Sequence, residues 1–134
     1  MVVSHIYCVD PWESMYDLSD KASYTNMTLV ENEFDQRFKH DDRVTKVKGT
    51  IDTLSEMIER GEIAEKTIDV VYIDGCHTYD AVKHDISVAL KKIKPKYAIA
   101  GHDYGWPGIH DAIAESLGAV DETYSDSSWL KTLV

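Results

Sequence analysis

The stretch from Ile68 to Tyr104 constrains the fold more than any other part of this chain. It reads as a strand, a polar turn, a helix, a second strand and a second polar turn. The first strand is a nearly continuous, β-branched apolar run from Ile68 to Ile73, which is the pattern of a parallel strand covered on both faces. Strand, helix and strand in this order make a βαβ unit, so we expect an α/β fold with a mostly parallel sheet.

The helix of this unit is predicted from Tyr79 to Lys94. Its apolar residues recur at helical spacing and predict one buried face, formed by Val82, Ile86, Ala89, Leu90 and Ile93. Lysines occupy its last turn, where cations suit the negative helix end, and Pro95 stops it. The second strand of the unit is predicted from Tyr97 to Ala100.

Ionisable side chains gather where these two strands end. Asp74 and His77 follow the first strand, and His102 and Asp103 follow the second. The carboxyl edge of a parallel sheet is where open α/β sheets bind ligands. Carboxylates and imidazoles there can hold Mg²⁺, Mn²⁺ or Ca²⁺. They can also act as a metal-free general base, with His77 titrating nearest neutral pH, or can simply bond loop backbone. The residues alone leave these three interpretations open.

The rest of the chain alternates further strands and helices. We expect a strand over residues 2–9, a loop over 13–25, a helix from Asn26 to Phe38, an edge strand over 44–47, a helix opening at Thr50 and stopped by Gly61, a helix from Ile109 to Leu117, and two short strands over 119–124 and 128–133. No repeat and no internal boundary is visible. The chain of 134 residues therefore predicts a single domain, residues 1–134.

Composition excludes several classes of partner. Fourteen basic and twenty-four acidic residues leave a formal charge of −10, with no basic cluster, so nucleic acid is not expected to bind. No apolar run approaches membrane-spanning length, and nothing near the start resembles a signal peptide. The two cysteines, Cys8 and Cys76, form no CxxC pair. We therefore expect a cytoplasmic protein with neither a nucleic-acid nor a membrane partner.

Asp10 and Trp12 stand at the end of the strand predicted over residues 2–9. In doubly wound nucleotide-binding folds, an acid at the end of the second strand accepts hydrogen bonds from ribose hydroxyls. The neighbouring indole could stack on an adenine. Taken alone, however, an aspartate after a strand is an ordinary turn residue, and the indole can equally cover the sheet edge.

Taken together, six segments resemble the class I S-adenosylmethionine-dependent methyltransferases, in the subgroup that includes macrocin-type sugar O-methyltransferases. They are VDPW (9–12), KGT (48–50), VVYIDGCHTYDAVKHDI (70–86), IAGHDY (99–104), PGI (107–109) and DSSW (126–129). The most specific part is IDG-x-H-x-Y combined with HDY at the next strand end. The resemblance implies a Rossmann-like methyltransferase sheet, mostly parallel, with a C-terminal antiparallel hairpin.

The resemblance also implies S-adenosylmethionine as cofactor and a small molecule, through a hydroxyl, as methyl acceptor. The implied cofactor-binding residues are Asp10, Trp12, Thr50, Ile51, Asp74 and Gly75. Among them, Asp10 would bind the ribose, and Thr50 and Ile51 would line the adenine pocket.

Metal-dependent members of this family hold a cation at positions that match Asp74, His102 and Asp103, with Mg²⁺ as the candidate here. The chain departs from their pattern twice. Cys76 stands where those members carry an acid proposed as general base, so His77 would take that role beside Asp74 and Asp103. An imidazole, His102, replaces the first of the paired acids.

The family's first strand and glycine-rich loop have no counterpart in this chain, which therefore looks truncated at the N-terminus. That strand is central in the family's sheet order, 3-2-1-4-5-7-6, and residues 2–9 match the second strand. Either the sheet closes up, or a homodimer or partner chain fills the gap, or the chain is a fragment of a longer reading frame. A small-molecule methyltransferase is the leading hypothesis. The alternatives are a non-catalytic or partner-dependent remnant without cofactor binding, and a metal-dependent hydrolase or other nucleotide-binding enzyme.

Overall fold

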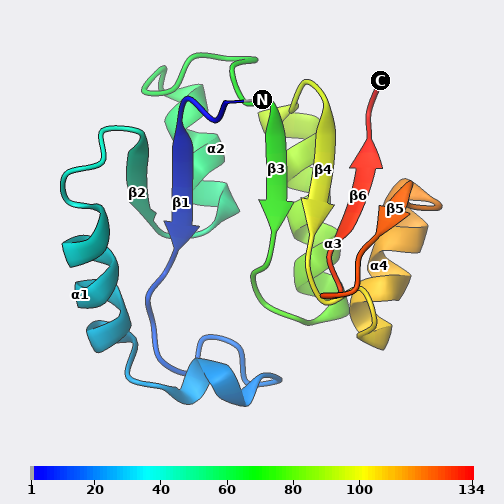
Figure 1. The fold of residues 1–134 in the computed structure, drawn as a ribbon. Helices are drawn as coiled ribbons and strands as arrows, with labels where there is room; N and C mark the ends of the chain where they lie inside the picture. Colours follow the sequence, from blue (N-terminus) through cyan, green and yellow to red (C-terminus); the bar gives the residue numbers. More distant parts are fainter. Residues whose placement is uncertain (1) are drawn as a thin grey trace. The chain divides into compact units, whose positions relative to one another are not determined.

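A computed structural model describes residues 2–134, which divide into two compact units (Figure 1). The first unit ends at Leu54, and the second unit runs from Ser55 to Val134. Each unit has a sheet of its own: β1 and β2 pair in the first, and β3, β4, β6 and β5 pair in that order in the second. That residues 1–134 make a single domain stays a prediction.

The first unit is built on two parallel strands. Strand β1 (Ile6–Asp10) pairs with β2 (Val44–Lys48), with Ile6 opposite Val44 and Asp10 opposite Lys48. The prediction that the first strand starts at residue 2 is wrong, because β1 starts at Ile6. Ile6 lies opposite Val44, which is the first residue of the partner strand β2. Val2 and Val3 have no ladder to join and are exposed.

Helices α1 and α2 of this region match their sequence signals. Helix α1 (Met27–Phe38) begins after Asn26, whose side chain accepts the backbone N–H groups of Thr28 and Leu29. A short 3-10 helix (Lys21–Tyr24) interrupts the predicted loop. Helix α2 (Ile51–Glu59) is followed by Gly61, whose φ of 76° is the left-handed conformation of a helix stop.

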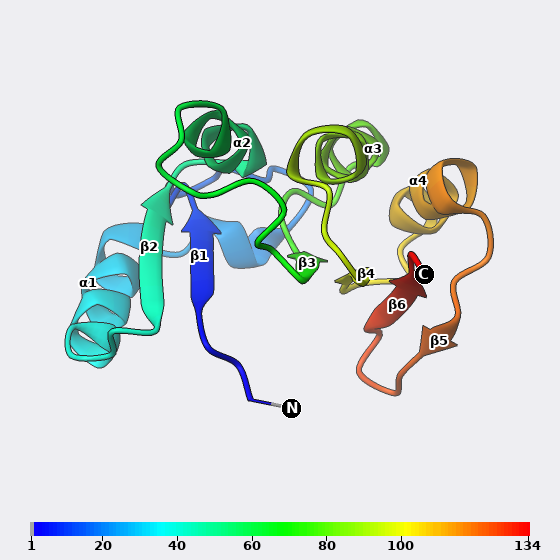
Figure 2. The ribbon, with the colours of Figure 1, turned by 90° about the horizontal axis from the view of Figure 1, so that it is seen from above.

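The second unit is a four-stranded sheet with helices on one face. Its elements are β3 (Val70–Ile73), α3 (Tyr79–Val88), β4 (Ala98–Gly101), α4 (Pro107–Leu117), β5 (Glu122–Thr123) and β6 (Trp129–Thr132). Strands β3 and β4 are parallel, whereas β6 is antiparallel to both β4 and β5, which confirms the predicted hairpin. Figure 2 shows α3 and α4 on the same side of this sheet.

Strand β3 is covered on one face only, so the prediction of cover on both faces is wrong. Val71 and Ile73 are buried, whereas Val70 and Tyr72 are 47% and 55% exposed. Successive side chains of a strand point to opposite faces of the sheet. In the described second unit, α3 and α4 lie over the face that carries Val71 and Ile73, which leaves the other two side chains open.

The end of α3 differs from its sequence pattern. The helix is capped by Thr78, whose hydroxyl accepts the Ala81 N–H, and continues past Val88 as a π-helix (Ala89–Ile93). Lys94 then adopts the left-handed conformation, with φ 54°. The extra residue of a π turn rotates the helix face. Leu90, inside the π turn, is therefore only half-buried, whereas Val88, just before it, is buried.

The core of the second unit lies between this helical layer and the sheet. Its largest fully buried side chains are Trp129, Ile86, Ile99 and Ile113. Helix α4 ends at Gly118, as predicted, where φ is 71°. Among residues 2–134, no helix has the length and apolarity that crossing a bilayer requires.

Strands β1 and β3 each have one strand partner in the described part of the chain, β2 and β4 respectively. Closure of the sheet across the missing strand stays a prediction. A partner chain and a longer reading frame stay predictions.

Candidate functional site

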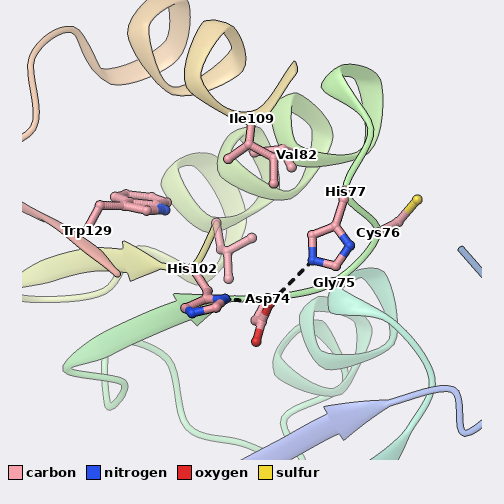
Figure 3. A pocket seen from close by; sticks show the side chains of 9 residues that line it. Asp74, Gly75, Cys76, His77, Val82, His102, Ile109 and Trp129 are labelled. Carbon is pink, nitrogen blue, oxygen red and sulfur yellow. Dashed lines mark ion pairs between the residues drawn. The ribbon is translucent and has the colours of Figure 1, made fainter. Parts of the chain in front are cut away.

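A cluster of four ionisable side chains lies where β3 and β4 end, and three of them, Asp74, His77 and His102, line a small cavity (Figure 3). We call Asp74, His77, His102 and Asp103 the strand-end cluster. The parallel register sets Ile73 opposite Gly101, so the residues that follow the two strands adjoin. The sequence predicted that these four would share one edge, and the structure brings them into contact.

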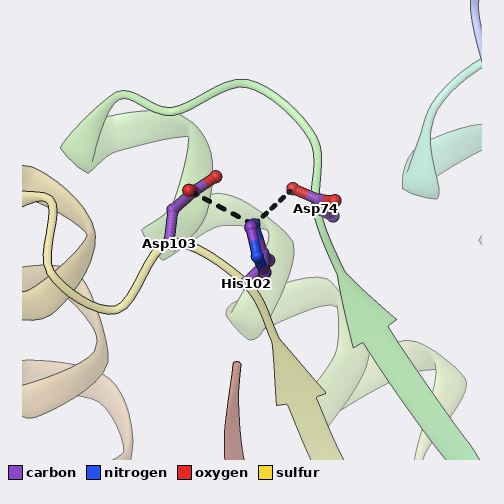
Figure 4. A group of neighbouring side chains, drawn as sticks. All are labelled: Asp74, His102 and Asp103. Atoms are coloured by element: carbon purple, nitrogen blue, oxygen red, sulfur yellow. Dashed lines mark ion pairs between the residues drawn. The ribbon is translucent and has the colours of Figure 1, made fainter. Parts of the chain in front are cut away.

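Each carboxylate of the cluster faces both imidazoles. His77 Nε2 lies 2.6 Å from Asp103 Oδ2 and 3.6 Å from Asp74 Oδ1. His102 Nδ1 lies 3.2 Å from Asp103 Oδ1 and 4.0 Å from Asp74 Oδ1 (Figure 4). The His77 and Asp103 side chains are only 12% and 19% exposed, so their contact is largely shielded from water.

The backbone around the cluster holds it in place. His77 directly precedes the Thr78 cap of α3, and its ring centroid lies 4.8 Å from that of Trp106. Asp103 has a left-handed backbone, with φ 57°, and its carbonyl accepts the Trp106 N–H. Gly101 is required beside it, because a Cβ there would lie 2.5 Å from the Ile73 carbonyl oxygen. The cluster therefore rests on a sheet and on a helix start.

The charges of the cluster stabilise a cationic imidazole. Burial alone would lower the pKa of His102, but a hydrogen bond to Asp103, a hydrogen bond with the Asp126 backbone and the negative charges of Asp103 and Asp74 outweigh it. The pKa of His102 is therefore raised above its ordinary value of 6.5. The two carboxylates therefore favour the protonated form of the His102 imidazole.

The donor atoms of Asp74, His102 and Asp103 suit a divalent cation. They lie within 4.8 Å of one another. Oxygen-only sets favour Mg²⁺ and Ca²⁺, whereas imidazole suits metals such as Fe²⁺ and Zn²⁺, and Mn²⁺ accepts carboxylates. The structure brings the three predicted metal ligands together, and the imidazole makes a transition-metal ion better suited to them than Mg²⁺.

Asp10 lies at the corresponding edge of the first unit. Its Oδ1 accepts the Trp12 backbone N–H at 2.6 Å, and its backbone carbonyl accepts the Gly49 N–H at 3.0 Å. Burial raises the pKa of Asp10, the Trp12 hydrogen bond lowers it, and the charge of Glu31 raises it again, with a net rise. Additional hydrogen-bond donors stabilise a partly desolvated carboxylate, and the hydroxyls of a ribose would be such donors.

Trp12 is packed inside the first unit. It is 8% exposed, its ring centroid lies 5.1 Å from that of Phe34, and Lys46 Nζ lies 4.9 Å from the ring centroid. This fits the alternative that the indole covers the sheet edge, because little ring surface is left for an adenine. Its place in a cofactor site stays a prediction.

Thr50 and Ile51 are half-buried at the start of α2, directly after β2. The Thr50 N–H donates to Thr53 Oγ1 at 3.1 Å, which fixes the helix start. Since Asp10 is opposite Lys48 in the β1–β2 ladder, these residues reach the same edge as Asp10. Gly75 lines the cavity beside Asp74 in the second unit. The roles of these three residues toward a cofactor stay predictions.

Trp129 is the site residue that sequence reasoning missed. It lines the cavity beside the strand-end cluster, from strand β6. The segment DSSW, which ends at Trp129, was a signal for it, but no chemical role could be attached to the indole without its neighbours.

Comparison with known proteins shows a likeness to methyltransferases in sequence and in structure. A family model described as a methyltransferase domain matches residues 2–104. The apo structure of CalS11, a TDP-rhamnose 3′-O-methyltransferase of calicheamicin biosynthesis, is similar at a TM-score of 0.61 with 14% sequence identity. That match covers 96% of this chain and 58% of CalS11, so this chain spans less than two thirds of that protein's length. The structural match confirms the predicted Rossmann-like fold. No curated protein matches the sequence.

Proposed function

Because this chain belongs to the methyltransferase-domain family, we propose that it transfers a methyl group from S-adenosylmethionine to a hydroxyl of a small molecule. The observation that carries the proposal is the 2.6 Å contact between His77 Nε2 and Asp103 Oδ2. It provides an oriented, shielded imidazole at the sheet edge where open α/β folds bind ligands.

The strand-end cluster suits the proton transfer of this reaction. The acceptor oxygen attacks the sulfonium methyl in line: an O–CH₃ bond forms, the S–CH₃ bond breaks, and the hydroxyl proton must leave. His77 takes that proton, and Asp103 orients its ring and stabilises the imidazolium that forms. Asp74, 3.6 Å from His77 Nε2, adds a second negative charge. Positioning of donor and acceptor supplies most of the remaining acceleration.

A divalent cation is a second element of the proposal. Asp74, His102 and Asp103 would hold it. When bound, such an ion lowers the pKa of the acceptor hydroxyl and orients it. Without it, the two carboxylates favour the protonated form of His102, which would add positive charge to the cluster.

Cofactor binding is proposed to rest on Asp10. The carboxylate that accepts the Trp12 N–H through Oδ1 would accept ribose hydroxyls through Oδ2. Hydrogen bonds from hydroxyls to a partly desolvated carboxylate are charge-assisted, so losing them should weaken binding clearly.

The test is isothermal calorimetry of the 134-residue chain with S-adenosylhomocysteine, with and without Mn²⁺ or Mg²⁺. We expect binding by the wild-type chain, and weaker binding by Asp10→Asn than by the control Glu13→Gln, which changes an exposed acid nearby. His77→Gln should bind normally but lower the rate of methyl transfer by about 10²–10⁴-fold. His40→Gln, in an exposed turn, is its control. A wild-type chain that gives no heat and no rise in melting temperature would count against the proposal.

The pairing of the strands favours a partner-dependent form of this function. Strands β1 and β3 each have one strand partner within residues 2–134. A second copy or another chain that supplies a strand would pair their free backbone groups. Light scattering across a concentration series, combined with S-adenosylhomocysteine titrations, tests this. Affinity that rises with assembly supports it, and a monomer that binds with constant affinity at all concentrations rules it out.

A further inference from the structure

The indole N–H of Trp129 is buried without a hydrogen-bond partner in the described part of the chain. The side chain is 1% exposed, and its Nε1 makes no hydrogen bond to residues 2–134. Buried tryptophan N–H groups usually have a partner, because leaving such a donor unpaired is costly. This donor therefore points to something that the chain itself does not provide.

The indole lies in the wall of a small cavity beside the strand-end cluster. Figure 3 shows the Trp129 nitrogen on the side of its ring that faces the other lining residues. Asp74, His77 and His102 form a polar part of the wall, and Val82 and Ile109 form an apolar part. The cavity volume is about 10 Å³, which is close to the minimum that one water molecule requires.

The occupant must be small and must accept a hydrogen bond. An indole N–H is a donor only, so it disfavours a cation directly in front of it. A space of about 10 Å³ matches the size of one water molecule. A buried water also needs two to four polar partners, which the carboxylate and the imidazoles in the wall offer beside the indole.

We infer that one ordered water molecule occupies this cavity, accepts the Trp129 indole N–H and donates to the strand-end cluster. Trp129 is then a positioning residue: through the water it links strand β6 to the imidazole and carboxylate groups at the ends of β3 and β4. The presence of the water does not depend on the proposed function. Its role in methyl transfer does rest on that function.

The first experiment is NMR of the full chain with ¹⁵N-labelled tryptophan. We expect a dipolar cross-peak between water and the Trp129 indole proton, with the sign of a long-lived contact. The indole of Trp106, which is 37% exposed, serves as an internal reference for surface water. A crystal structure should show an ordered oxygen about 2.7–3.2 Å from Nε1. A dry cavity, or an indole bonded to a side chain, would overturn the inference.

The second experiment uses Trp129→Phe, which removes the N–H and keeps an aromatic ring. We expect the water to disappear and kcat to fall about tenfold with KM unchanged, as when a supporting hydrogen bond of a site is lost. The control Tyr124→Phe removes an exposed hydroxyl of the neighbouring hairpin. It should leave the water, kcat and KM unchanged. If the Trp129→Phe variant does not fold, the NMR spectrum of the wild-type protein still shows whether the water is present. Water at the indole without any methyl transfer would refute the proposed function and leave this inference standing.

Discussion

The two units of this chain bury their helices very differently. In the second unit, α3 buries Val82, Ile86 and Val88, and α4 buries Ile109 and Ile113. In the first unit, α1 has no buried residue at all. Burial of apolar surface is the main source of helix stability in proteins. The comparison teaches that the strand-end cluster stands on a well-packed base, whereas Asp10 belongs to a unit with a much smaller core.

Ion pairs tie a strand of the first unit to its helix. Lys46 contacts Glu31 at 2.7 Å and Asp35 at 2.8 Å, and Lys48 contacts Glu31 at 2.8 Å, so that β2 is tied to α1. Hydrogen bonds from Lys46 and Lys48 lower the pKa of Glu31. Such partly exposed ion pairs contribute little free energy compared with buried aliphatic side chains. The first unit should therefore open more easily than the second.

Native-state hydrogen exchange measures this contrast directly and should give the largest effect. We expect amides of α1 to exchange through local opening, and amides of α3 and α4 only through near-global unfolding. The difference in opening free energy should be on the order of 3–5 kcal/mol, because local stabilities span the range up to the global value. Equal protection of the α1 and α3 amides would contradict the expectation that the first unit opens more easily than the second.

The second-largest effect is expected when one buried and one exposed aliphatic side chain, each in a helix, are truncated to alanine. Ile86 is fully buried and Leu29 is 64% exposed. Ile86→Ala should lower the free energy of unfolding by about 2–5 kcal/mol through lost burial and a residual cavity. Leu29→Ala should change it by no more than about 0.5 kcal/mol. Urea denaturation followed by circular dichroism checks both, and similar losses in the two variants would contradict the difference in packing.

The helix caps provide a smaller and sharper test. Thr78 caps α3 through Oγ1, and Asn26 caps α1 through its side-chain oxygen. Thr78→Ala should cost about 1 kcal/mol of global stability. Asn26→Ala should mainly increase fraying of α1, since the helix has little packing to lose with it. Thermal melts together with exchange rates distinguish the two results, and an equal global cost for both caps would argue for a first unit as cooperative as the second.

Asp10 should give the smallest effect, and its sign follows from its pKa. Because the folded-state pKa of Asp10 is raised from 3.8, folding favours its protonated form. Stability should therefore fall as pH rises from the ordinary to the raised pKa, and the full cost remains above that window. Asp10→Asn removes this cost and keeps an oxygen for the Trp12 N–H. We expect it to be more stable than wild type at pH 7 by about 0.5 kcal/mol or less. Melting curves from pH 3 to 7 test this, and a variant less stable throughout would show the reverse sign.

Much of the fold could be predicted because its signals are local. Helices α1, α2 and α4 follow their apolar spacing and their caps at Asn26, Gly61 and Gly118. The errors concern partners distant in sequence. The true start at Ile6 depends on where β2 begins, and the exposure of Tyr72 depends on which face the helices cover. Neither property is encoded within the strand concerned.

The candidate site shows the same limit. Parallel strand ends were enough to bring Asp74, His77, His102 and Asp103 to one edge. The contact of His77 with Asp103 further depends on the left-handed backbone of Asp103, which no spacing rule predicts. The π turn at Ala89–Ile93 was equally hidden, because its residues also fit an α-helical stripe.

The strand order of the second unit has a consequence for synthesis on the ribosome. Strand β6 lies between β4 and β5, although it is the last of them to be made. Strand β4 must therefore wait with one ladder edge unpaired until Trp129 emerges and its ring covers Gly101. A nascent chain stalled before Trp129 would expose that edge and part of the core, which makes it a substrate for chaperones rather than a folded intermediate.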